Sequence, residues 1–123
     1  MSGGQTHTGI EKLEIKTAYA TLISGAYTVK IDFVNTGDGA TGIELISLNG
    51  IPTTASGWSS TITLGGDIVI GSSCPTGVTR TGTVSFPEGI TDPSGNALGP
   101  GVMLNISINT VGGKVYYASV ILP

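Results

Sequence analysis

Apolar and hydrophilic residues alternate one by one along most of this sequence, and a repeat of two is typical of β-strands with one buried face. The run from 26 to 35 shows the pattern clearly, with apolar residues at 27, 29, 31 and 33 and hydrophilic residues at 28, 30 and 32. Glycine, proline, asparagine, aspartate and serine separate the runs, as expected for turns between strands. No helix of any length is predicted.

The predicted strands are 11–22, 26–35, 42–49, 60–64, 67–70, 81–86, 101–109 and 114–122. Between the last two, the pair Gly112 and Gly113 predicts a tight two-residue hairpin, because both residues tolerate positive φ. Seven to eight short strands with regularly spaced turns predict an all-β fold, a two-sheet antiparallel β-sandwich of the immunoglobulin-like kind. A small closed barrel is the alternative.

A length of 123 residues fits one domain with a single core. We expect residues 1–9, with the sequence MSGGQTHTG, to be a flexible lead and residues 10–123 to form the β-sandwich domain. The sequence contains no apolar run of about 20 residues, so it predicts no membrane-spanning segment of its own. An anchoring helix upstream of this sequence stays open.

Charged residues make up only 11% of the sequence, less than half of the roughly 25% usual in soluble domains. The surface is therefore expected to consist mainly of hydroxyl and amide groups. The five basic residues do not cluster, so the sequence lacks the electrostatic footprint of a nucleic-acid-binding protein. No nucleic-acid partner is expected.

Residues able to perform catalysis are sparse. The only histidine, His7, lies in the lead, the carboxylates are scattered, and Cys74 has no partner at metal-ligand spacing. Asp38 and Asp92 lie in glycine-rich loops that could offer oxygen ligands to calcium, but each loop brings few carboxylates and ordinary turns are the favoured interpretation. We therefore expect no enzyme activity, no catalytic residue, no cofactor and no metal site.

Two predicted strands carry apolar residues on both sides, which a two-layer sandwich does not require. In the run 42–49, Ile43 and Leu45 fall on one side while Ile46 and Leu48 fall on the other, and the run 114–122 is apolar on both sides as well. Either loops or another subunit cover the second side, and both interpretations stay open. These four residues and Trp58, in a polar loop, are the candidate interface residues; Trp58 is also a candidate platform for a sugar ring.

The run 101–109 is expected to direct Met103, Asn105, Ser107 and Asn109 outward and its even-numbered apolar residues inward. The tripeptide Asn105-Ile106-Ser107 matches the acceptor pattern for N-glycosylation. Asn105 is therefore a possible glycosylation site if the protein is exported.

Two stretches, VKIDFVNTGDGATGIELISLNGIP and VMLNISINTVGGKVYYASVILP, resemble the extracellular β-sandwich of archaeal type IV pilin-like proteins. In that family, strands run through an NTG turn into a strand of the form I..I.LNG, and a hairpin of the form I.T..G..Y..SV.LP closes the chain. The resemblance covers most of Thr28 to Pro52 and Met103 to Pro123.

Within that group, the size and the low charge are most similar to the soluble domains of archaellum stator proteins. This resemblance implies a protein that is anchored in the membrane through an N-terminal helix missing from this sequence. Its sandwich would lie in the pseudoperiplasm between membrane and S-layer, bind the S-layer protein and other archaellum stator or filament subunits, and form a homodimer. The alternatives are an archaellin or pilin-type filament subunit and a carbohydrate-binding module.

Overall fold

The structure is a computed structural model and describes residues 9–123; most of the expected lead, including His7, lies outside the described residues. The described chain contains strands and turns only. The strands are β2 (Leu13–Ile23), β3 (Ala26–Asn35), β4 (Thr41–Leu48), β5 (Ile51–Pro52), β6 (Thr63–Gly66), β7 (Ser73–Cys74), β8 (Thr79–Pro87), β9 (Met103–Thr110) and β10 (Val115–Ile121).

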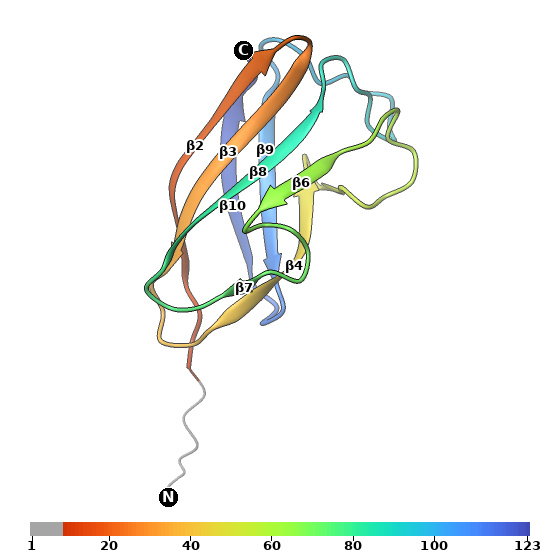
Figure 1. Cartoon of the computed structure of the whole chain (residues 1–123). Coiled ribbons are helices and arrows are strands. Elements are labelled where there is room, and N and C mark those ends of the chain that lie inside the picture. Colours follow the sequence, from red (N-terminus) through yellow and green to blue (C-terminus); the bar gives the residue numbers. More distant parts are fainter. Residues whose placement is uncertain (1–8) are drawn as a thin grey trace, which may run out of the picture.

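Two antiparallel sheets lie face to face (Figure 1). The first sheet has the order β2-β3-β8-β6, and the second has the order β10-β9-β4-β5 with β7 paired to β4. These two orders match the ABED and CFG sheets of a constant-type immunoglobulin fold. The predicted β-sandwich is therefore confirmed. Its seven longer strands are those that the alternation reveals, and β5 and β7 are two-residue strands that it does not.

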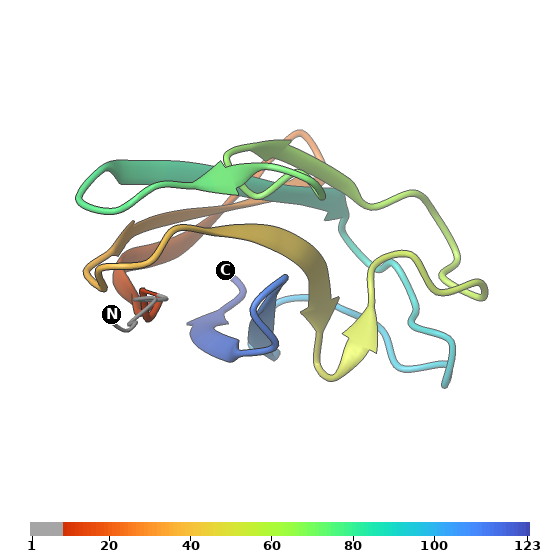
Figure 2. The ribbon, with the colours of Figure 1, turned by 90° about the horizontal axis from the view of Figure 1, so that it is seen from below.

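Figure 2 shows the two sheets as stacked layers, and the core between them is built from the alternating residues that the sequence singles out. From β3, the side chains at 27, 29, 31 and 33 are fully buried, and from β9 those at 104, 106 and 108 are fully buried. The ring of Tyr27 packs on Phe86 with 5.6 Å between centroids, and its hydroxyl donates to the carbonyl oxygen of Pro123 at 2.9 Å. The end of the chain is thereby fixed to the core.

A β-bulge between Ile43 and Leu45 corrects the predicted faces of β4. One extra residue shifts the alternation by one position, so Ile43, Ile46 and Leu48 all face the core and are at most 1% exposed. The prediction that Ile43 and Leu45 share a side is wrong for this reason. A second bulge, between Ile15 and Thr17, likewise reverses the faces along β2.

The predicted strand 67–70 is wrong, because these residues form a turn. Gly66 and Gly71 flank the turn with φ of 65° and 96°, values that residues with a side chain rarely adopt. The turn directs Ile68 into the core, where it packs directly on Gly82 of β8. The turn is set by the backbone conformation of these two glycines. The spacing of apolar side chains therefore does not reveal it.

The predicted hairpin between β9 and β10 is present, with a longer loop than expected. The N–H of Thr110 donates to the carbonyl oxygen of Lys114 at 3.0 Å, which encloses three residues rather than two. Of the two loop glycines, Gly113 has a positive φ of 86° and closes the turn.

Candidate interaction surface

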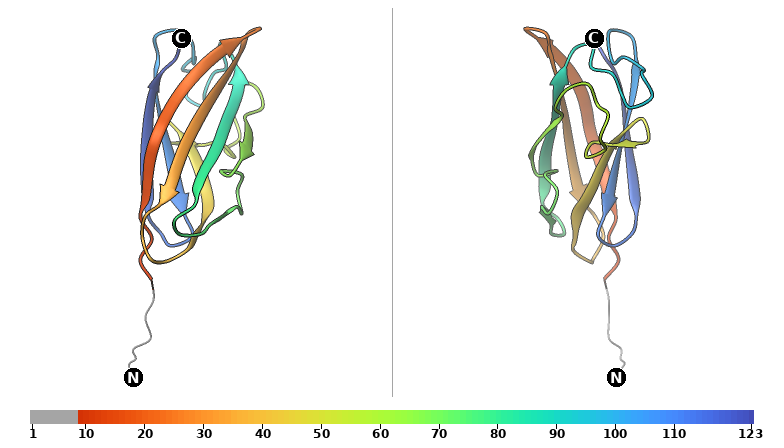
Figure 3. Two further views of the ribbon diagram at one scale, coloured as in Figure 1. Left: turned by 60° about the vertical axis from the view of Figure 1, so that its left-hand side comes forward. Right: turned by 90° about the vertical axis from the view of Figure 1, so that its right-hand side faces the viewer.

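The outward side of β9, β10 and the part of β4 beyond its bulge carries no Asp, Glu, Lys, Arg or His; the exposed Glu44 lies in the bulge itself. Strand register places its side chains in four rows across β10 and β9, and two of these rows continue onto β4. We call this surface the uncharged face, and it consists of Leu45, Ser47, Met103, Asn105, Ser107, Asn109, Val115, Tyr117, Ser119 and Ile121. Figure 3 shows β9 and β10 as an outer wall of the molecule.

Large apolar side chains on the uncharged face are open to solvent. Tyr117 is 67% exposed, Ile121 64% and Met103 51%. Between them, Ser119 donates through Oγ to Oδ1 of Asn105 at 2.6 Å. A flat apolar strip with interspersed amides and hydroxyls is typical of a protein contact surface rather than of a solvated face.

The outward side of the first sheet is different in chemistry. We call it the hydroxyl face, and it consists of Thr17, Tyr19, Thr21, Ile23, Thr28, Lys30, Asp32, Thr81, Thr83 and Ser85. Its carboxylate, Asp32, accepts hydrogen bonds from the hydroxyls of Thr17 at 2.6 Å and Thr81 at 2.5 Å. These bonds, from Thr17 first, lower the pKa of the Asp32 carboxyl below its usual value.

A buried carboxylate lies at the end of the sandwich where β2 begins. Glu11 is 6% exposed, and its Oε1 accepts hydrogen bonds from the hydroxyls of Thr41 at 2.8 Å and Thr110 at 2.9 Å. Its Oε2 accepts from the Tyr116 hydroxyl at 3.1 Å, and Lys114 Nζ donates to its main-chain oxygen at 3.1 Å. Burial raises the pKa of the Tyr116 hydroxyl, and the bond to Glu11 adds to that rise.

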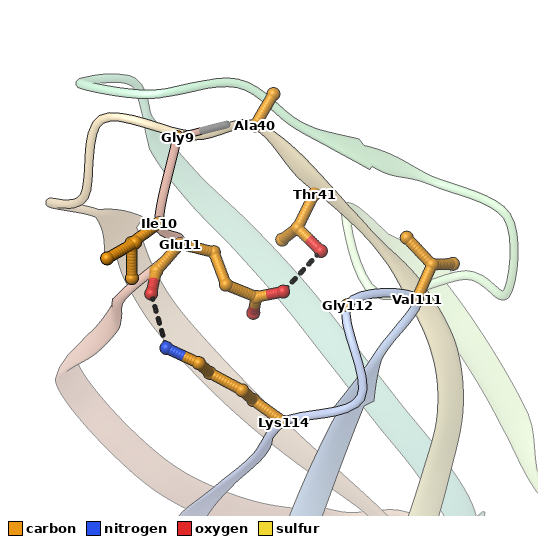
Figure 4. A pocket seen from close by; sticks show the side chains of 8 residues that line it. All are labelled: Gly9, Ile10, Glu11, Ala40, Thr41, Val111, Gly112 and Lys114. Carbon is orange, nitrogen blue, oxygen red and sulfur yellow. Dashed lines mark hydrogen bonds between the residues drawn. The ribbon is translucent and has the colours of Figure 1, made fainter. Parts of the chain in front are cut away.

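Glu11 forms part of the wall of an open depression of about 480 Å³ (Figure 4). Sequence reasoning did not single out this residue. Its three hydroxyl partners are 30, 99 and 105 residues away in the chain, so no local motif connects them. A glutamate at the first position of a predicted strand is an ordinary surface residue on pattern alone.

Four of the five candidate interface residues lie away from the uncharged face. Ile43, Ile46 and Leu48 fill the core, so their side chains have no surface to offer a partner. Trp58 is half-buried, packs against the core and donates through Nε1 to the carbonyl oxygen of Pro52 at 3.0 Å, and its contact with a partner or a sugar stays a prediction. Leu45 alone lies on the uncharged face, and its contact with a partner stays a prediction.

Asn105 is exposed and faces outward as expected, and its glycosylation stays a prediction. The two loop aspartates accept backbone hydrogen bonds: Asp92 Oδ1 from the N–H groups of Ser94 and Asn96, and Asp38 Oδ1 from that of Ile10. Among residues 9–123, no three His, Cys, Asp or Glu side chains gather as a metal site would require.

Neither the models of known protein families nor the curated protein sequences give a match to this chain. Over the described range, no helix has the length and apolar character needed to cross a membrane. A functional assignment therefore depends on the geometry and on the resemblance in the two quoted stretches.

Proposed function

We propose that this chain is a non-enzymatic binding domain of the archaeal cell envelope, which holds an archaellum motor stationary by binding the S-layer protein. The resemblance to archaellum stator domains motivates the class of partner, and the immunoglobulin-like sandwich suits a rigid module of this kind. The uncharged face is the docking surface in this proposal.

The observation that carries the proposal is the contrast between exposure and charge on that face. Three of its large side chains are more than half exposed, and none of its ten residues is Asp, Glu, Lys, Arg or His. Apolar area in contact with water favours association by about 25 cal/mol per Å² buried. Binding through such a face is expected to depend little on salt, because no ion pair has to form.

An uncharged surface also suits a location outside the cell, where pH varies. Nine of its ten side chains are aliphatic, thioether, hydroxyl or amide groups, which carry no charge at acidic or neutral pH. This constancy is useful to an anchor, which has to stay bound whatever the external conditions.

Binding of solubilised S-layer protein to immobilised domain tests the proposal. Tyr117→Lys places a charge in the middle of the uncharged face and is expected to weaken affinity at least about tenfold, or about 1.4 kcal/mol. Tyr19→Lys is the matched control, because Tyr19 is 47% exposed on the hydroxyl face. Equal affinity of the two variants would exclude the uncharged face, and no binding by the wild-type domain would exclude the partner.

The same variants show whether the uncharged face binds a second copy of the chain or the S-layer protein. Sedimentation of the free domain gives its mass, and a wild-type dimer that Tyr117→Lys converts into a folded monomer would assign the face to self-association. In that case the S-layer protein would have to bind elsewhere.

Carbohydrate binding is the second candidate function. Tyr117 is a better candidate than Trp58 for the ring that contacts a sugar. The Tyr117 ring is 67% exposed on a face that also carries the amides of Asn105 and Asn109, and an aromatic ring beside amides can hold a sugar. S-layer protein stripped of its glycans separates the two, since only a carbohydrate-binding domain would lose affinity for it.

A further inference from the structure

The segment Gly9–Lys12 lies between the two sheets at the end of the sandwich where β2 begins, and it is hydrogen-bonded on both sides. We call it the tether segment. On one side it pairs with the β3–β4 loop of the sandwich. The N–H of Thr36 donates to the carbonyl oxygen of Lys12 at 2.8 Å, and that of Asp38 donates to the carbonyl oxygen of Ile10 at 3.0 Å. The Asp38 carboxylate in turn accepts a hydrogen bond from the N–H of Ile10 at 2.8 Å.

On its other side, the tether segment is bonded to the second sheet through Glu11. Its buried carboxylate accepts from Thr110 at the end of β9 and from Tyr116 on β10. Lys114, from the hairpin between these strands, donates to the main-chain oxygen of Glu11, and Figure 4 shows this bond beside the one between the Glu11 carboxylate and Thr41. Hydrogen bonds to a charged group are about twice as strong as neutral ones.

Two glycines make this close approach possible. A Cβ at Gly112 would overlap Oε1 of Glu11, and a Cβ at Gly37 would overlap the carbonyl oxygen of Ile10. Gly112 has no positive φ to explain it, so its role in the hairpin is to leave room for the carboxylate. Both partners of the tether segment are therefore shaped to receive it.

The direction of the first and last strands determines how tension would load these bonds. β2 begins at one end of the molecule, and the chain finishes at the other, after β10 has run in the same direction as β2 (Figure 1). The two strands pack beside each other near the tether segment (Figure 3). Tension between the chain ends is thus directed along the strands, and the Glu11 bonds are loaded together in shear instead of one after another.

We propose that the tether segment is a mechanical clamp, which lets the domain carry tension along its strands without unfolding. The clamp joins both sheets to the point where the chain enters the fold, so neither sheet can be peeled away first. This role goes beyond binding, because it concerns the load and not the identity of the partner.

Single-molecule unfolding at constant force tests the clamp, with handles attached to the two ends of the full chain. Glu11→Gln keeps the shape of the side chain but removes its charge, and it is expected to unfold at least about tenfold faster than wild type, since rates under force follow the unfolding barrier. Glu14→Gln is the matched control, because Glu14 is exposed and pairs with Lys16 on the surface. Its unfolding rate should stay within about twofold of wild type.

A second pulling geometry distinguishes a mechanical clamp, whose effect depends on the direction of force, from a general contribution to folding stability. Handles at Ser24→Cys, in the β2–β3 turn, and at the C-terminus load one end of the molecule and bypass the tether segment. Glu11→Gln should then change the unfolding rate by less than about twofold. Equal acceleration in both geometries, or none between the chain ends, would overturn the proposal. Gly112→Ala, which displaces the carboxylate, should reproduce the result for Glu11→Gln and serves if that variant fails to fold.

Discussion

The two outer faces of this sandwich share one backbone geometry and differ in side-chain chemistry. On the hydroxyl face, threonine hydroxyls and a carboxylate bond to one another, as the pair of bonds to Asp32 shows. On the uncharged face, serine and asparagine do the same through Ser119 and Asn105, but Tyr117 and Ile121 stay largely in water.

This difference indicates which face needs a partner. Polar groups that are already hydrogen-bonded to each other gain little free energy from contact with a second protein, because they would also have to lose water on binding. Exposed apolar groups gain on every contact. The hydroxyl face also exposes Tyr19 and Ile23, but it carries the charges of Lys30 and Asp32, so it is interpreted as the solvated side and the uncharged face as the contact side.

The largest expected effect comes from two neighbouring positions on β4. Ile46→Lys places a charge in the core and should cost more than about 4 kcal/mol, which is most of the stability of a small domain. Leu45→Lys lies on the uncharged face and should leave the fold intact. Circular dichroism with urea titration checks both. A folded Ile46→Lys variant would contradict the bulge that sets the face of each residue.

The second effect uses a glycan to block one face at a time. Expression in a eukaryotic secretory host that modifies Asn105 should abolish binding to S-layer protein, because the sugar would cover Tyr117 and Ile121. Thr83→Asn, combined with Asn105→Gln, creates the same tripeptide pattern on the hydroxyl face and should leave binding unchanged. A gel shift reports occupancy.

Enzymatic removal of the glycan is the control and should restore binding to the first protein. Binding that survives an occupied Asn105 would contradict the assignment of the contact side. Native glycosylation of Asn105 would contradict it as well, so the sequence-based prediction of glycosylation and the assigned contact side exclude each other.

The smallest effect concerns pH on the hydroxyl face. The folded pKa of Asp32 is lowered, so the stability it contributes is present above its unfolded pKa of about 4 and is lost as pH falls through the folded value. Thr17→Val should raise this pKa toward the ordinary value, measured by carboxyl NMR titration. Thr21→Val, on the same strand, should not, because its hydroxyl bonds to a carbonyl group. Equal pKa values in both variants would contradict the assigned cause.

The sequence predicts most of the fold because alternation is a local property. It places the faces of β3 and β9 correctly, and it reveals that β10 is apolar on both sides, which is the origin of the uncharged face. The bulge in β4 escapes such reasoning, since one extra residue reverses the side of everything that follows and depends on pairing with β9.

The candidate site is less predictable than the fold, because its parts meet only in three dimensions. Trp58 looked available in a polar loop, but its indole bonds to Pro52 and packs on the core. Glu11 looked ordinary until its partners from three strands came together. Neither contact leaves a signal in the spacing of nearby residues.

Hydroxyl-radical footprinting of the domain, alone and saturated with S-layer protein, tests the assigned contact surface most directly. It reports the solvent access of individual side chains without any mutation, and methionine and tyrosine react readily. Oxidation of Met103 and Tyr117 should fall several-fold in the complex, while oxidation of Tyr19 stays unchanged. Protection of Tyr19 with Met103 and Tyr117 still reactive would place the contact on the opposite face and contradict the assignment.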